Sequence, residues 1–184
     1  MSLCFDKHYK FTLLDEIGTV PVMYFPGIST SEGGHDGILV QIVPANGELW
    51  VGCFEFGPSL VNSVTGVYTT PDPDRLAIAS RGAGYLVSSS SPSRWEKVEV
   101  FPVLGVYPVP QHDVLIFKDY TRLVAYGSEG VRWRTERLAY DDFDVVDVTD
   151  LYLHCELWSL RSEKKVGFTV EIVTGKVHGN DEIV

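Results

Sequence analysis

The feature that most constrains the fold is a succession of short apolar or alternating segments, because segments of this length suit strands better than helices. Apolar residues spaced at i, i+3, i+4 and i+7 are nearly absent, and the best such stretch, Trp133 to Tyr140, fits a strand equally well. Turn residues separate the segments, and Asn46-Gly47 is the strongest hairpin signal among them. The pattern predicts an all-β fold. The clearest strand candidates are residues 20–25, 38–43, 49–56, 76–80, 85–88, 95–101, 114–118, 123–126, 151–158 and 168–173.

Composition and length agree with a β domain. Aromatic residues make up 12% of the chain, which favours strands over helices. A chain of 184 residues suits a single domain, residues 1–184, that buries enough surface to be stable without disulfides or metals. For residues 1–10 the sequence allows two alternatives, a disordered end or a part of the domain. We expect about 12 to 16 short strands, three or four from each ~40-residue unit of the repeat described next.

A repeat is the most informative internal feature. Residues Val64–Tyr68 match residues Val103–Tyr107 at an offset of 39. A turn residue three places before a Trp also recurs, and in the last copy His178 takes the place of the Trp. Repeats of this kind bury their apolar faces by stacking. We therefore predict that Trp50, Trp95 and Trp133 are buried in equivalent positions of about four Trp-marked repeats, which cover roughly residues 19–58, 59–101, 102–140 and 141–179.

Two stretches carry a family resemblance. Residues Val170–Val177, a strand that turns at Thr174-Gly175, resemble the end of a quinoprotein-type β-propeller repeat, and residues Leu123–Trp133 are similar. The resemblance implies antiparallel repeats in a small or partial propeller. The Trp comes one residue earlier than in that family's pattern, and no Trp-Asp dipeptide of the WD-repeat kind occurs. A β-sandwich, a barrel, or a ring completed by a second chain are the alternatives. The resemblance implies a scaffold and no chemistry.

Charge and cysteine usage restrict the partners and the compartment. With 15 Lys and Arg against 25 Asp and Glu, the formal charge is −10. This charge disfavours nucleic acid and anionic membranes, and it suits either solubility alone or a basic protein partner. The three cysteines, Cys4, Cys53 and Cys155, form no Cys-x-x-Cys pair, which is typical of a reducing compartment. With no signal-peptide pattern and no apolar run of about 20 residues, the sequence predicts a cytoplasmic protein.

Catalytic signatures are missing from the sequence, which contains no Gly-x-Ser-x-Gly, phosphate-loop, His-Glu-x-x-His or dinucleotide-binding motif. We therefore predict no cofactor and no metal site. The dipeptides His35-Asp36 and His112-Asp113 would supply a general base or metal ligands if they met at one end of the fold. Solvated turns explain each dipeptide better. A small-ligand binder or hydrolase-type enzyme built on these four residues is the alternative to a non-enzymatic function.

The segment from His154 to Glu156 is expected to be a strand in which alternation places His154 and Glu156 on one face and Cys155 on the other. Such a strand does not form a tight metal site by itself.

The last candidate is an acidic run that consists of Asp141, Asp142, Asp144, Asp147 and Asp150. It fails the calcium-loop pattern, because Val146 and Asp147 occupy positions that need an oxygen ligand and a glycine. Guarding a strand edge is the simpler role, and contacting a basic partner is the more specific one. The sequence thus favours a non-enzymatic protein-interaction module with an acidic rim, and a homo-oligomer if the repeats leave a ring incomplete. The candidate contact residues are Tyr140, Asp141, Asp142, Phe143 and Asp144.

Overall fold

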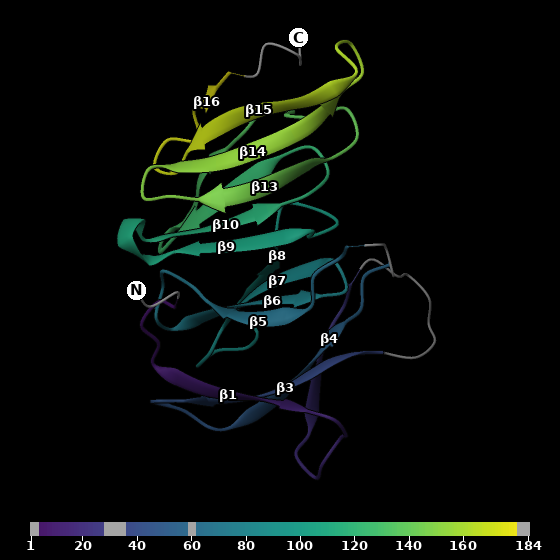
Figure 1. Ribbon diagram of the computed structural model, residues 1–184. Coiled ribbons are helices and arrows are strands. Elements are labelled where there is room, and N and C mark those ends of the chain that lie inside the picture. The colour runs from purple at the N-terminus through teal and green to yellow at the C-terminus, as the bar shows by residue number, and fades with distance from the viewer. Residues whose placement is uncertain (1–3, 28–35, 59–61, 180–184) are drawn as a thin grey trace.

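The chain folds into four β-sheets that follow one another in chain order, as the computed structural model in Figure 1 shows. The structure describes residues 4–27, 36–58 and 62–179. Within these ranges there are sixteen strands and one short 3-10 turn, η1 (Pro110–His112), and no α-helix. The predicted all-β class is therefore confirmed, and the strand number lies at the upper end of the expected range. No helix in the described ranges is long and apolar enough to cross a membrane.

Sheet A contains the first four strands and has the least regular topology. β1 pairs antiparallel with β3, β3 pairs antiparallel with β4, and β2 lies parallel to β4 at the other edge. The connection from β1 to β2 therefore passes from one edge of the sheet to the opposite edge. In spatial order the strands are β1 (Tyr9–Leu14), β3 (Gly37–Pro44), β4 (Trp50–Glu55) and β2 (Val22–Phe25).

Sheets B, C and D share a simpler topology, in which four consecutive strands pair antiparallel in chain order. Sheet B contains β5 (Gly66–Thr69), β6 (Arg75–Ser80), β7 (Ala83–Ser88) and β8 (Trp95–Lys97). Sheet C contains β9 (Gly105–Val109), β10 (Val114–Lys118), β11 (Leu123–Gly127) and β12 (Gly130–Arg134). Sheet D contains β13 (Phe143–Val148), β14 (Tyr152–Ser159), β15 (Lys164–Glu171) and β16 (Val177–His178).

The core consists of three apolar layers, one between each pair of neighbouring sheets. The first joins sheets A and B, the second joins B and C, and the third joins C and D. Sheets B and C are thus covered on both faces, which explains why every residue of β10 is buried. Among the described residues no cluster joins sheet D back to sheet A, so the stack has two ends. Large members of the three layers include Phe25, Phe54 and Tyr85, then Leu86, Phe117 and Tyr126, and finally Ile116, Phe143 and Phe168.

The N-terminal segment is attached to the stack from the first residues that the structure describes. Phe5 is buried in the layer between sheets B and C, and its backbone N–H donates to Thr69 Oγ1 at 2.9 Å. Tyr9 begins β1 and is buried against sheet B. Residues 4–10, which the sequence left open as part of a disordered end, therefore hold defined contacts with two sheets.

Two of the repeat-marking tryptophans have the same structural role. Trp50 faces sheet B and donates its indole N–H to the Ser89 carbonyl at 2.7 Å, and Trp133 faces sheet D and donates to the Ile172 carbonyl at 2.8 Å. Each acceptor lies one residue beyond the third strand of the next sheet and 39 residues from its tryptophan. Each indole thus fastens one sheet to the next through a buried hydrogen bond.

Trp95 does not share this position, so the prediction of three equivalent, buried tryptophans is wrong for this residue. Its side chain is half-buried and lies on the face of sheet B that packs against the preceding sheet, with its ring centroid 5.6 Å from that of Phe25. The physical reason is the strand alternation: Trp95 pairs with Val87 of the sheet A side, whereas Trp133 pairs with Ala125 of the sheet D side.

A glycine makes room for Trp133. Gly175 has φ of +72°, and a Cβ atom at this position would lie 2.7 Å from the Trp133 ring. Both the backbone conformation and the close approach of the ring therefore require glycine. The Thr174-Gly175 turn that stood out in the sequence is explained by this contact.

We predict that Trp133→Phe lowers the free energy of unfolding by about 2–4 kcal/mol, because it leaves the buried Ile172 carbonyl without its donor and a gap beside Gly175. Trp95→Phe is the matched control and should cost about 1 kcal/mol, since that ring is only half-buried. Urea denaturation followed by circular dichroism measures both values. Equal losses in the two variants would contradict the role given to the indole hydrogen bond.

Candidate functional site: the outer face of sheet D

Sheet D ends the stack, and its two faces differ sharply. In β14, Leu153, Cys155 and Leu157 are buried against sheet C. The alternate residues His154, Glu156 and Trp158 point to the other side, which we call the outer face of sheet D, and no further sheet covers this face in the described part of the chain. The expected separation of His154 and Glu156 from Cys155 is confirmed.

Trp158 is the most unusual residue of this outer face. Its side chain is 60% exposed, whereas Trp50 and Trp133 are 8% exposed. Tyr152 lies on the same face, with edge-on ring contacts to His154 and His178 at centroid distances of 6.4 and 6.2 Å. Exposed tryptophan and tyrosine beside polar groups are the residues that contribute most energy in protein interfaces.

The outer face also carries an excess of acid. Asp144 of β13 lies directly opposite Glu156 of β14 in the strand register, and like charges in this position destabilise a sheet. Lys165 Nζ lies 3.2 Å from Glu156 Oε2 and offsets part of this repulsion. At the far side of the face, Glu171 accepts hydrogen bonds from Thr174 and His178, which lower the pKa of its carboxyl group. A cationic group from outside would relieve the remaining repulsion.

The centre of the outer face is hollowed. Gly167 has no side chain, and a Cβ atom there would have only a backbone oxygen as a neighbour within 4 Å. The resulting depression is about 470 Å³ in volume and has His154, Glu156, Thr169 and His178 on its walls. A side chain from a partner could enter this depression.

The acidic run borders the same face. The part of the run within Phe143–Val148 belongs to β13, which is an edge strand of sheet D. Its carboxylates therefore lie at an edge where another strand would otherwise pair. Tyr140, Asp141 and Asp144 are exposed. Asp142 is exposed as well, but it accepts a hydrogen bond from the buried ammonium of Lys118 at 2.7 Å. Phe143 is 2% exposed and belongs to the core, so it is not available as a contact residue.

The two His-Asp dipeptides lie in separate parts of the stack. His35 falls outside the described residues, and Asp36 precedes β3 of sheet A. His112 and Asp113 form the turn before β10 of sheet C, where His112 Nε2 hydrogen-bonds the Asp150 carbonyl at 2.5 Å and Asp113 has φ of +51°. No group of three His, Cys, Asp or Glu side chains within the described ranges is arranged to hold a metal ion. The second dipeptide connects sheets C and D.

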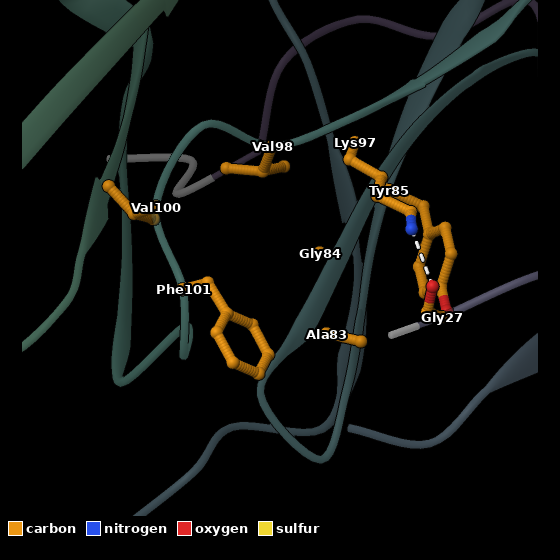
Figure 2. A pocket seen from close by; sticks show the side chains of 8 residues that line it. All are labelled: Gly27, Ala83, Gly84, Tyr85, Lys97, Val98, Val100 and Phe101. Atoms are coloured by element: carbon orange, nitrogen blue, oxygen red, sulfur yellow. Dashed lines mark hydrogen bonds between the residues drawn. The ribbon is translucent and has the colours of Figure 1, made fainter. Parts of the chain in front are cut away.

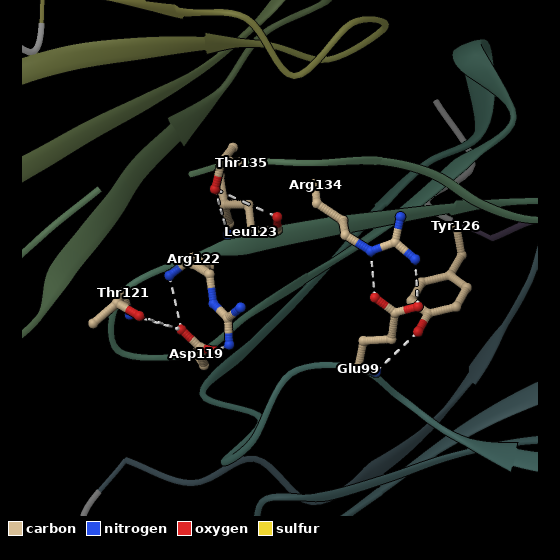
Figure 3. A network of polar contacts seen from close by, with 8 residues as sticks. All are labelled: Glu99, Asp119, Thr121, Arg122, Leu123, Tyr126, Arg134 and Thr135. Carbon is tan, nitrogen blue, oxygen red and sulfur yellow. Dashed lines mark hydrogen bonds and ion pairs between the residues drawn. The ribbon is translucent and has the colours of Figure 1, made fainter. Parts of the chain in front are cut away.

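A polar network bridges sheets B and C at the surface of the stack (Figure 3). Glu99, which follows β8, receives two hydrogen bonds from Arg134 at the end of β12, through Nε and through a terminal nitrogen. The Glu99 backbone N–H also donates to Tyr126 Oη at 2.9 Å. Nearby, the buried Asp119 carboxylate caps the β10–β11 turn by accepting from the backbone N–H groups of Thr121 and Arg122. These charged groups therefore have structural roles, as a bridge between two sheets and as a cap of a turn.

Comparison of the chain with protein-family models, with curated proteins and with solved structures finds no match in any of the three. The functional assignment therefore depends on the geometry described above.

The sequence pattern did not single out Trp158 or Tyr152, and His178 stood out only as the residue that replaces a repeat Trp. A usable signal was present, because the alternation that placed His154 and Glu156 together continues to Trp158. The pattern does not show that this face lies at the end of the stack, because alternation alone does not distinguish an end sheet from an inner one.

We predict that the Glu99 carboxyl titrates below the ordinary glutamate pKa of about 4.3, because its hydrogen bonds from Arg134 favour the charged form. The stability gained from this pair should be present above pH 4.3 and be lost as the pH falls through the lowered pKa. Carbonyl-detected NMR of Glu99 measures the titration. Arg134→Gln should return the pKa to the ordinary range, whereas Arg132→Gln should leave it lowered.

We also predict that one thiol of the native protein reacts quickly with a disulfide reagent and that two do not. Cys4 is exposed, whereas burial raises the pKa of Cys53 and raises that of Cys155 to about 12. Fewer thiolates form at a raised pKa, and the thiolate is the reacting species. Thiol counting at pH 8 with and without denaturant gives the numbers. A fast-reacting thiol in Cys4→Ser would show that a buried cysteine is accessible.

Proposed function

We propose that this chain is a non-enzymatic protein-interaction module whose contact surface is the outer face of sheet D together with its acidic β13 edge. The observation that carries the proposal is the exposed Trp158 ring, which lies on the outward face of the last sheet among ionisable side chains. An exposed tryptophan beside charged groups, here Lys165 opposite it in the register, supplies an apolar anchor with a polar rim. The rest of the stack serves as the scaffold that presents this face.

Charge supports a basic protein as the partner. The chain has a formal charge of −10, and the outer face carries Asp144, Glu156 and Glu171, with Lys165 beside Glu156 and Lys176 near Glu171. A basic protein surface would neutralise this excess, whereas nucleic acid would be repelled. Two copies of this chain joined through sheet D would place the same acids against one another. The proposed occupant is therefore a different protein with a basic, apolar-centred patch.

The acidic edge has a kinetic role in this proposal. Tyr140, Asp141 and Asp144 are exposed and border the face, so they would attract a basic partner during encounter. Asp142 and Phe143 act indirectly, because they pair with Lys118 and pack beneath β14.

For the fold itself, we propose a propeller-like stack that stops short of a ring. Sheets B, C and D support this interpretation, since each is a four-stranded antiparallel meander packed face to face on its neighbour. Sheet A departs from the pattern through its parallel β2 strand. Exposed apolar side chains near sheet A, among them Tyr24 and Val43, support a second candidate, in which another copy completes the ring.

The decisive test measures binding of an isolated partner to variants of sheet D. A partner captured from native extract is purified, and its affinity is measured by surface plasmon resonance. We predict that Trp158→Ala weakens binding tenfold or more, because it removes the anchor. The double variant Asp141→Asn with Asp144→Asn should slow association at low salt and have little effect at high salt, where charges are screened.

Matched controls come from the opposite end of the stack. Leu13→Ser removes an exposed apolar side chain of sheet A, and Asp15→Asn removes an exposed acid, and both should leave the affinity unchanged. Failure to capture any partner in stoichiometric amount would contradict the proposed module. Unchanged affinity in Trp158→Ala would show that the module uses another face. A concentration-dependent dimer in sedimentation that Leu13→Ser dissolves would favour the second candidate instead.

A further inference from the structure

A second concave site lies at the edge of sheet B, away from the outer face of sheet D. Where the chain leaves β8 and runs toward β9, it bows away from β7 and encloses a cavity of about 240 Å³ (Figure 2). An apolar cavity of roughly 150 Å³ holds a benzene molecule, and sites for drug-sized ligands begin at roughly 300 Å³. The size therefore suits a small molecule with one ring or a short chain. The walls are formed by Gly27, Ala83, Gly84, Tyr85, Lys97, Val98, Val100 and Phe101.

One side of this cavity is polar and has a fixed geometry. Lys97 Nζ donates to the Gly27 carbonyl at 2.5 Å, and the Gly27 N–H donates to Glu55 Oε2 at 2.5 Å. Tyr85 Oη donates to the Glu55 carbonyl at 2.7 Å. These bonds hold the ammonium, the phenol and the Gly27 backbone at the same side, as Figure 2 shows for Lys97, Tyr85 and Gly27. An ammonium has three donors, so Lys97 can bind an acceptor in addition to Gly27.

The opposite side is apolar. Val98, Val100 and Phe101 come from the connection after β8. In Figure 2 Val100 and Phe101 lie on the side away from Lys97, and Val98 lies between Val100 and Lys97. Val98 and Val100 are buried, which fixes this wall, whereas Phe101 is exposed and can be reached from solvent. Ala83 and Gly84 of β7 lie between the two sides and leave the space open because they have little or no side chain.

We propose that this cavity binds a small monocarboxylate with an aromatic or short aliphatic tail. The carboxylate would pair with the Lys97 ammonium and accept a charge-assisted hydrogen bond, while the tail would pack against Val98, Val100 and Phe101. A cationic ligand is disfavoured, because Lys97 is the charged side chain among the lining residues and Glu55 is already bonded to Gly27. A polyanion is disfavoured by the single ammonium and the apolar wall. The site lies on sheet B and is independent of the interaction face on sheet D.

Two probes of the same shape test this assignment, 4-phenylbutyrate and its neutral analogue 4-phenylbutanol. Isothermal titration calorimetry gives the affinities, and two-dimensional amide NMR locates the site. We expect the acid to bind with a Kd below about 1 mM, the alcohol to bind at least tenfold more weakly, and the shifts to centre on residues 83–85 and 97–101.

Variants separate the charge from the apolar wall. Lys97→Met should weaken the acid to the affinity of the alcohol and leave the alcohol unchanged, which also shows that the cavity keeps its shape without the bond to Gly27. Lys10→Met, an exposed lysine of β1, is the matched control and should bind both probes normally. Phe101→Ala should weaken both probes severalfold. Equal affinity of the two probes for the native protein would overturn the assignment, as would shifts centred elsewhere or no binding of the acid at 10 mM.

Discussion

The packing of one sheet face on the next is the constraint on which this structure depends. A four-stranded sheet of this size cannot bury both of its faces alone, and sheets B and C obtain cover on both sides only by lying between neighbours. The indole hydrogen bonds of Trp50 and Trp133 fix the relative position of two of these layers, since each reaches a backbone carbonyl of the following sheet. Directional bonds of this kind restrict sliding, which apolar contact alone does not prevent.

The parts of the fold that the sequence could predict are those controlled by neighbouring residues. Turns such as Asn46-Gly47 and Thr174-Gly175 and the short apolar runs between them indicate the all-β class directly. The strand order of sheet A depends on pairing between β2 and β4, whose partners Val22 and Val51 are far apart in the chain, so no local pattern reveals it. Trp95 was misplaced for a related reason, because a shift of one residue in pairing moves a side chain to the other face.

The same distinction between local pattern and tertiary contact applies to the candidate surfaces. Charge density alone marked the acidic segment as a candidate contact surface, but only tertiary contacts show that Asp142 pairs with Lys118 and that Phe143 lies in the core. The cavity beside Lys97 could not be predicted, because its walls come from β7, from the segment after β8 and from Gly27, which meet only in the folded chain. Aromatic and charged residues can be assigned to an exposed or a buried face only once the ends of the stack are known, and Trp158 is the clearest example.

The strand order of sheet A also has a consequence for the way the chain folds. Sheets B, C and D are built from consecutive hairpins, so each can form soon after its own residues are available. In sheet A, β1 must wait for β3 and β2 must wait for β4, and each pairing closes a loop of many residues before it gains any contact. During synthesis β1 and β2 thus emerge before their partners β3 and β4. This leaves β1 and β2 as unpaired edges for a period, and the charged residues Lys10, Asp15 and Glu16 are suited to keep those edges from pairing with other molecules.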